Sequence, residues 1–137
     1  MTRRVRIMGA KWIKVSVLYF LLGVGFGLYM HATVQLEWGA THAHINVVGW
    51  LTTVAVGVIY SIYPQAGNSA LGKLQFWLYN LGLPILLIGM LIIQPVLGVS
   101  VVLVDIFVWA GGIALALSIL LFIVNVFQHV HQSTDVQ

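Results

Sequence analysis

The sequence lacks cysteine and has few charged residues. Without cysteine the chain forms no disulfide and offers no thiolate ligand to zinc or to an iron–sulfur cluster. Of 137 residues, 6 are Lys or Arg and 3 are Asp or Glu, whereas 61% are hydrophobic. Soluble domains carry about 25% charged residues, so this composition predicts an integral membrane protein. Six cations are also too few to build a nucleic-acid-binding face.

Four apolar runs are long enough to cross a bilayer, which takes about 20 residues of helix. We predict a single all-α transmembrane domain over residues 1–137, with four helices at 12–31, 42–63, 74–93 and 105–128. The middle connection contains the turn residues Pro64, Gly67, Asn68 and Gly72. The last connection is itself apolar, so either it forms a re-entrant piece or the fourth helix begins before residue 105.

The cations lie on one side of this predicted arrangement. Five precede or open the first span and Lys73 follows the second, whereas the other two connections hold only Glu37 and Asp105. Loops rich in Lys and Arg stay in the cytoplasm, so both termini are predicted inside, in a multi-pass protein of the bacterial inner membrane. The glycine-interrupted first run, without an Ala-x-Ala cleavage site, favours a retained helix over a signal peptide.

Aromatic residues and glycines give two further expectations. Trp and Tyr prefer the membrane interface, and those near the inner span ends are Trp12, Tyr60, Tyr63, Trp77 and Tyr79. Glycines in spans usually allow close helix packing, the alternative being clearance for a bulky cofactor. The first and fourth spans contain Gly23, Gly25, Gly27, Gly111 and Gly112.

The five histidines are the principal candidates for chemistry, because an ionisable group within or at the end of a span costs free energy. His129 and His131 follow the fourth span, where a His cation stabilises a helix C-terminus. His31, His42 and His44 belong to the opposite, outer end. Neutral imidazoles at that end are the groups on which a function is most readily built.

The helical period distinguishes His42 from His44. At about 100° per residue, the face of His42 continues through Asn46, Gly49, Thr53, Gly57 and Tyr60, which are small or polar. The face of His44 is apolar, as expected for a surface that meets lipid or another subunit. Periodicity therefore favours His42 as an inward-pointing ligand. The alternative for this pair is a hydrogen-bonded helix start capped by Thr41.

Residues 41–64, THAHINVVGWLTTVAVGVIYSIYP, resemble the second transmembrane helix of the catalytic subunit of haem–copper oxidases and nitric oxide reductases. The whole chain is similar to small four-helix proteins described as cytochrome oxidase subunit I-like. The shared pattern is His-Ala-His-x-Asn, Gly-Trp and Tyr-x-x-x-Pro, matched here by His42, Ala43, His44, Asn46, Gly49, Trp50, Tyr60 and Pro64. In the oxidases a histidine of this helix ligates the low-spin haem, and the resemblance places that role on His44.

The resemblance implies a membrane-embedded b-type haem protein with an electron-transfer or respiratory accessory role, which acts with respiratory-chain proteins or a quinone. One axial ligand would be His42 or His44 and the second His31 or a histidine of another protomer. Asn46, Gly49, Trp50 and Thr53 complete the predicted site. The chain has five histidines, two of them at the other end, whereas an oxygen-reducing subunit needs six. Oxygen reduction by one chain is therefore not expected.

Oligomerisation follows from the same resemblance. The large oxidase subunit arranges twelve helices with approximate threefold symmetry, and this chain has four predicted helices. A homotrimer that imitates the larger ring is the natural hypothesis, and its glycine-lined faces would meet neighbouring copies.

Two other functions stay open. Met30, His31, His42 and His44 could gather copper or zinc at the outer face, since imidazole and thioether suit copper. The chain could also be a cofactor-free assembly subunit of a respiratory oxidase. Acid–base and nucleophilic catalysis find little support, because Glu37 and Asp105 lie at the outer boundary and no Ser–His–carboxylate motif is present.

Overall fold

The computed structural model describes residues 7–131, and this part of the chain is helical with no strand. Three long helices are continuous: α1 (Ile7–Thr33), α5 (Ala70–Ile92) and α6 (Val101–His129). A fourth long helical stretch covers Leu36–Ile62, and we call it the second span. All four are long and apolar enough to cross a membrane. The predicted all-α fold with four potential spans is therefore confirmed.

The second span is built from four successive segments. It begins with the 3₁₀ turn η1 (Leu36–Trp38) and α2 (Gly39–His44), continues as the π-helix η2 (Ile45–Thr52), and ends with α3 (Thr53–Ile62). A π-helix bonds each carbonyl to a residue five positions on, so its turns are wider than those of an α-helix. The change from α to π geometry occurs directly after His44.

Side-chain hydroxyls bond to the carbonyls of the π-helix. The hydroxyls of Thr52 and Thr53 donate to the carbonyls of Val47 and Val48, at 2.8 and 3.2 Å. Tyr79, on α5, donates its hydroxyl to the same Val48 carbonyl at 2.7 Å. The Tyr79 bond links the two halves of the molecule near the middle of the spans, and it involves an element distant in sequence.

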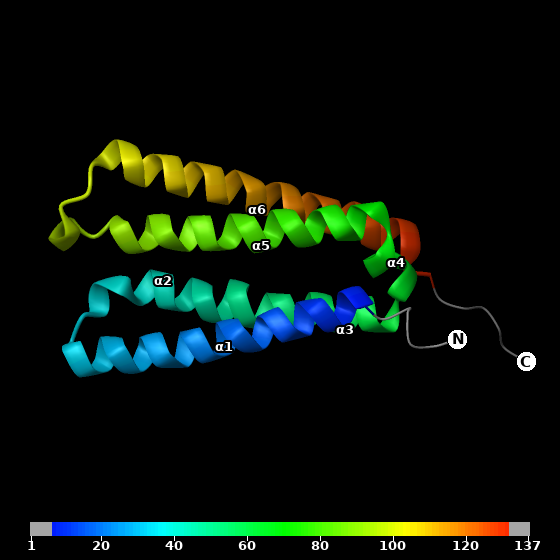
Figure 1. Ribbon diagram of the computed structural model, residues 1–137, viewed down its shortest axis with the longest axis horizontal. Coiled ribbons are helices and arrows are strands. Elements are labelled where there is room, and N and C mark those ends of the chain that lie inside the picture. Colours follow the sequence, from blue (N-terminus) through cyan, green and yellow to red (C-terminus); the bar gives the residue numbers. More distant parts are fainter. Residues whose placement is uncertain (1–6, 132–137) are drawn as a thin grey trace, which may run out of the picture.

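The helices form two antiparallel pairs, α1 with the second span and α5 with α6 (Figure 1). Contacts within each pair are far more extensive than contacts between the pairs. The short helix α4 (Pro64–Asn68) joins the pairs at one end. At the other end, α5 leads to α6 through the 3₁₀ turn η3 (Pro95–Leu97) and Gly98, whose φ of 60° favours glycine.

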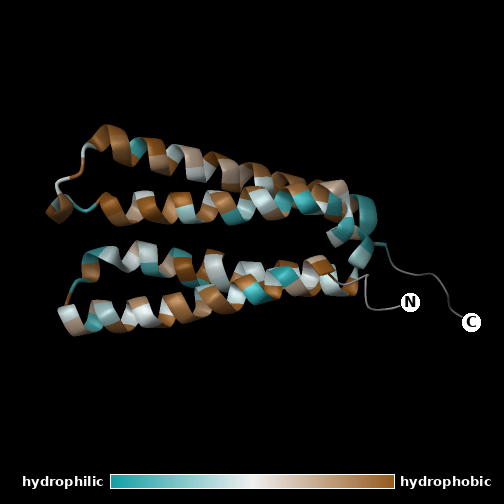
Figure 2. Cartoon of the chain, in the orientation of Figure 1, coloured by the Kyte–Doolittle hydropathy of each residue, from teal (hydrophilic) through white to brown (hydrophobic). Residues whose placement is uncertain are grey.

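The two ends of the molecule differ in charge. Lys11, Lys14 and Lys73 lie near α4, at what we call the basic end, where hydrophilic residues are concentrated (Figure 2). Glu37 and Asp105, the carboxylates of the described residues, lie at the opposite, acidic end. The separation of charge predicted from the sequence is therefore present in the described part of the fold.

An aromatic cluster holds the two pairs together toward the basic end. The ring centroid of Trp12 lies 5.3 Å from that of Phe76 and 5.1 Å from that of Tyr79, and both pairs of rings pack edge to face. Trp12, Tyr60 and Tyr79 are fully buried. These three rings therefore pack between helices, whereas their predicted level near the membrane interface stays a prediction. Trp77, exposed to 61%, faces outward.

The helix boundaries also correct the prediction. Residues 64–73 were expected to form a loop, but they contain α4 and the first turn of α5. Ser69 caps α5 by accepting a hydrogen bond from the Gly72 amide at 2.9 Å. Ser100 caps α6 in the same way, and α6 begins at Val101, which confirms the alternative that this helix begins before residue 105. Capping hydroxyls extend these helices beyond their apolar runs.

Candidate functional site

His42 lies in a notch on α1 formed by two glycines. Its Nε2 donates a hydrogen bond to the Gly23 carbonyl at 3.1 Å. A Cβ atom on Gly27 would lie only 2.8 Å from the same Nε2, so the ring fits because residue 27 has no side chain. His42 therefore points inward as the periodicity predicted, but α1 already engages the nitrogen that would bind a metal.

The residues that follow His42 on this face also contact α1. The Asn46 amide donates to the His42 carbonyl at 2.9 Å, and a Cβ on Gly23 would collide with the Asn46 side chain. Gly49 packs on the ring of Tyr19, and Thr53 is fully buried. Asn46 and Gly49 thus form the seam between the second span and α1, whereas Thr53 bonds within its own span, to the Val48 carbonyl.

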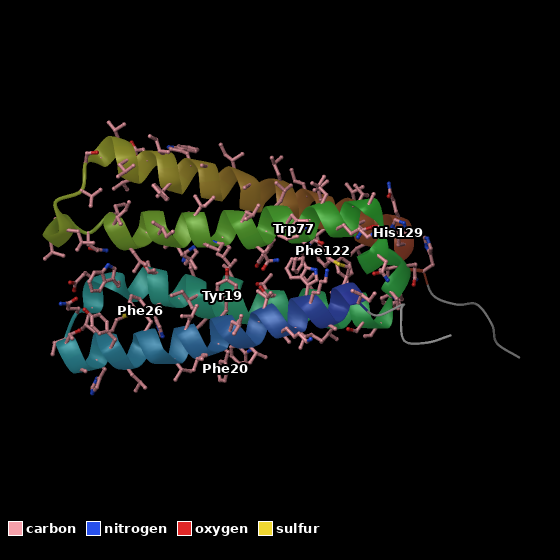
Figure 3. All side chains as sticks on the ribbon, in the orientation of Figure 1. Tyr19, Phe20, Phe26, Trp77, Phe122 and His129 are labelled. Carbon is pink, nitrogen blue, oxygen red and sulfur yellow. The ribbon has the colours of Figure 1, made fainter. Side chains whose placement is uncertain are left out.

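Trp50 lies away from this seam. Its ring is half-buried and 4.3 Å from the ring of Phe20, centroid to centroid. Tyr19 and Phe20 point to opposite sides of α1 (Figure 3), so Gly49 and Trp50 meet different sides of that helix. Trp50 consequently contributes to the outer surface of the α1 and second-span pair.

His44 has a different environment from His42. Its Nδ1 donates to the Ala40 carbonyl, one turn earlier, at 2.9 Å. Its Nε2 has no hydrogen-bond partner among the residues that the structure describes. A histidine whose Nδ1 is held by a backbone carbonyl presents Nε2 in the tautomer that binds metals. The structure thus leaves the metal-binding nitrogen available on His44.

The surroundings of His44 are apolar and open. His44 itself is half-buried, and Val47 and Leu51, which follow it in the same span, are exposed to 54% and 55%. This surface is on the outside of the four-helix unit, as predicted for a face that meets lipid or another subunit. A group bound by His44 would therefore lie against the exterior of one chain.

The structure does not gather the three outer histidines into one site. His31 is exposed at the end of α1. Within residues 7–131 no group of three or more His, Cys, Asp or Glu side chains is placed to hold a metal ion. A copper or zinc site built from His31, His42 and His44 would need ligands from another chain. His129 and His131 lie at the basic end, bonded to the carbonyls of Asn125 and Gln128.

An apolar groove of about 570 Å³ lies between α1 and α5. Tyr19, Phe26 and Ile45 line one side, and Pro84 and Leu87 the other. No described histidine lines it, so haem in this groove would have no imidazole ligand from the same chain. Among the three outer histidines, His44 is the one whose Nδ1 bonds to a carbonyl of its own helix, and it does not line this groove.

A buried polar network lies near the basic end. An isolated Asn in an apolar span predicts an interhelical hydrogen bond at Asn125, which the structure confirms, but the other members of the network do not follow from the sequence. Tyr60 donates to the Gln75 side-chain carbonyl, and the Asn125 amide donates to the Tyr60 hydroxyl at 2.8 Å. Ser118 donates to the Gln75 backbone carbonyl at 3.1 Å. The signal in the sequence is the isolated Gln and Asn within apolar spans. Because each group bonds another, the network serves to join three spans.

Comparison with known proteins adds no assignment. No protein-family model matches the chain, and no curated protein or solved structure matches it at a significant level.

Proposed function

We propose that this chain is a membrane-embedded b-type haem protein in which His44 is an axial ligand. The haem itself is what the resemblance to the oxidase helix implies. The observation that selects His44 over His42 is the hydrogen bond from His44 Nδ1 to the Ala40 carbonyl, which leaves Nε2 without a partner among the described residues. His129 is bonded in the same way to the Asn125 carbonyl, but it lies at the basic end. This arrangement fixes the ring and raises the basicity of the ligating nitrogen. It agrees with the resemblance to the oxidase helix, which also selects His44.

His42 has a structural role in this proposal. Its Nε2 bond to Gly23 and its contact with Gly27 hold the second span against α1. Ligation of iron by the same nitrogen would break that bond and would require space that α1 occupies. The sequence left His42 and His44 as alternatives, and the geometry favours His44.

Because His44 is only half-buried within one chain, the proposed haem would lie at an interface between chains. The apolar side chains of Val47 and Leu51 would cover part of the macrocycle, and a neighbouring copy would cover the remainder. His31 of a neighbouring copy, exposed at the same end of the molecule, is our choice for the second axial ligand. Haem bound in this way would transfer single electrons. We place the protein in the bacterial inner membrane, with both termini in the cytoplasm.

The test is a reduced-minus-oxidised absorption spectrum of the purified protein after haem loading. We expect the wild-type protein to show a Soret band with a split alpha band on reduction. His44→Ala should abolish stoichiometric haem binding, because it removes the ligand without disturbing the α1 seam. His131→Ala, an exposed histidine at the basic end, is the matched control and should leave the spectrum unchanged.

His42→Ala separates the two ligand assignments. It should lower stability but retain the haem spectrum at low temperature. A His44→Ala protein with an unaltered spectrum, or a loss of haem confined to His42→Ala, would contradict the assignment. Wild-type protein that takes up no haem would exclude the proposed function altogether.

A further inference from the structure

A second hollow, separate from the histidine region, opens at the basic end. It has a volume of about 670 Å³ and lies between the first turns of α1, the short helix α4 and the first turns of α5. Two lysines from different helices line it, Lys11 of α1 and Lys73 of α5. Ile7, Phe76 and Trp77 supply an apolar wall. The hollow therefore combines paired cations with hydrophobic surface.

The two lysines have no counter-charge nearby in the described structure. Glu37 and Asp105, the carboxylates within residues 7–131, lie at the acidic end, a full span length away. Lys14 adds a further positive charge at the basic end. An anion bound between Lys11 and Lys73 would neutralise a local excess of positive charge that the described residues do not balance.

The level of the hollow in the bundle indicates which anion it accepts. It lies where the apolar spans end and hydrophilic residues begin (Figure 2). Trp77, exposed to 61%, is the type of side chain that lies at the level of lipid headgroups. A phosphate headgroup would meet the lysines, and the glycerol and upper acyl carbons would meet Ile7 and Trp77. Free inorganic phosphate has no part that uses the apolar wall.

We infer that this hollow binds the phosphate headgroup of an anionic phospholipid, with Lys11 and Lys73 as its two cationic contacts. Basic pockets between membrane helices select such lipids over zwitterionic ones. The site joins the two helix pairs, because Lys11 belongs to the first pair and Lys73 to the second. A lipid held there would add an electrostatic link between them.

The experiment is native mass spectrometry of the purified full chain in mild non-ionic detergent, titrated with phosphatidylglycerol or phosphatidylcholine. We expect tighter binding of phosphatidylglycerol, which Lys11→Gln and Lys73→Gln each weaken by about fivefold. Lys14→Gln is the matched control, since it removes the same charge from α1 but does not line the hollow, and it should leave the affinity unchanged. Lys73→Arg should retain binding.

Three results would overturn the inference. Equal affinity of the wild-type protein for the two lipids would show no anionic site, and this comparison needs no variant. Equal losses of affinity for phosphatidylglycerol in Lys11→Gln, Lys73→Gln and Lys14→Gln would indicate that diffuse surface charge, and not this hollow, attracts the lipid. Displacement of phosphatidylglycerol by an equal concentration of inorganic phosphate would show a site for the free anion. Resistance to that displacement supports a lipid ligand.

Discussion

Two glycines of α1 have opposite surroundings although they are two residues apart. A Cβ on Gly27 would lie 2.8 Å from His42 Nε2, whereas a Cβ on Gly25 would meet no atom within 4 Å. Gly27 therefore makes room for an imidazole that bonds the Gly23 carbonyl. Gly25 has no packing requirement within one chain.

Gly27→Ala should displace the His42 ring and break its bond to Gly23. Combining overpacking with one lost hydrogen bond, we expect a destabilisation of about 1–2 kcal/mol relative to Gly25→Ala. The measurement is the free energy of unfolding of both variants in mixed detergent micelles. Equal free energies of unfolding for the two variants would show that the fit of His42 into the notch does not contribute to stability.

The same pair of variants bears on the ligand assignment. If His44 holds the haem, Gly27→Ala should keep the reduced-minus-oxidised spectrum even though His42 has moved. A spectral loss in Gly27→Ala that is absent in Gly25→Ala would point to His42 instead.

At the scale of the elements, α5 and α6 depend on a close backbone approach at Gly111. A Cβ there would collide with the Leu86 amide and would lie 2.7 Å from the Gly82 carbonyl oxygen. These are backbone atoms, which move only if the helices separate. A Cβ on Gly112, the next residue, would meet no atom within 4 Å.

Gly111→Ala should destabilise the α5 and α6 pair by about 2–3 kcal/mol, because overpacking against rigid backbone has no inexpensive relaxation. Gly112→Ala should be close to neutral and is the matched control. Thermal unfolding followed by circular dichroism compares the two. If Gly111→Ala were as stable as the wild-type protein, the backbones of α5 and α6 would not be in close contact at residue 111.

The elements also show how far the sequence could predict the fold. The number and approximate positions of the spans follow from the apolar runs, because such a run is a property of the local sequence. The start of α5 did not follow, because Ser69 extends that helix by capping an amide, whereas an early start of α6 was one of two alternatives that the apolar connection left open. The π-helix was missed because one of its carbonyl bonds comes from Tyr79, on another span.

For the candidate site, too, the sequence predicts what belongs to a single helix but not the contacts between helices. Helical period correctly placed His42 toward the inside and His44 on an apolar face, since that property belongs to one helix. It could not show that the Gly23 carbonyl engages His42 Nε2, a contact with α1. The buried positions of Trp12, Tyr60 and Tyr79 were also unpredictable from composition, because the same residue types suit an interface and a core.

On the scale of the whole molecule, large apolar side chains cover the outer surfaces. Trp109 and Phe127 of α6 are exposed to 68% and 80%, and Val47 and Leu51 of the second span to 54% and 55%. Lipid can cover such residues, but a haem at His44 needs a protein partner on its other side. The proposed function therefore requires more than one copy.

We expect a homotrimer in mild detergent, with a mass three times the 15.1 kDa of one chain plus its haem groups. Native mass spectrometry or light scattering with detergent subtraction provides the measurement. Detection of only monomers or dimers at micromolar protein would contradict the trimer. His44→Ala should weaken the assembly, because the proposed haem bridges neighbouring copies.

The division into two helix pairs has a consequence for how the protein is made. Because most contacts of α1 are with the second span, the first hairpin can pack before α5 leaves the ribosome. The second hairpin can then form its own α5 and α6 contacts independently. The bond between Tyr60 and Gln75 and the one between Tyr79 and Val48 join the two pairs, so we expect them to form last, when the finished hairpins dock side by side.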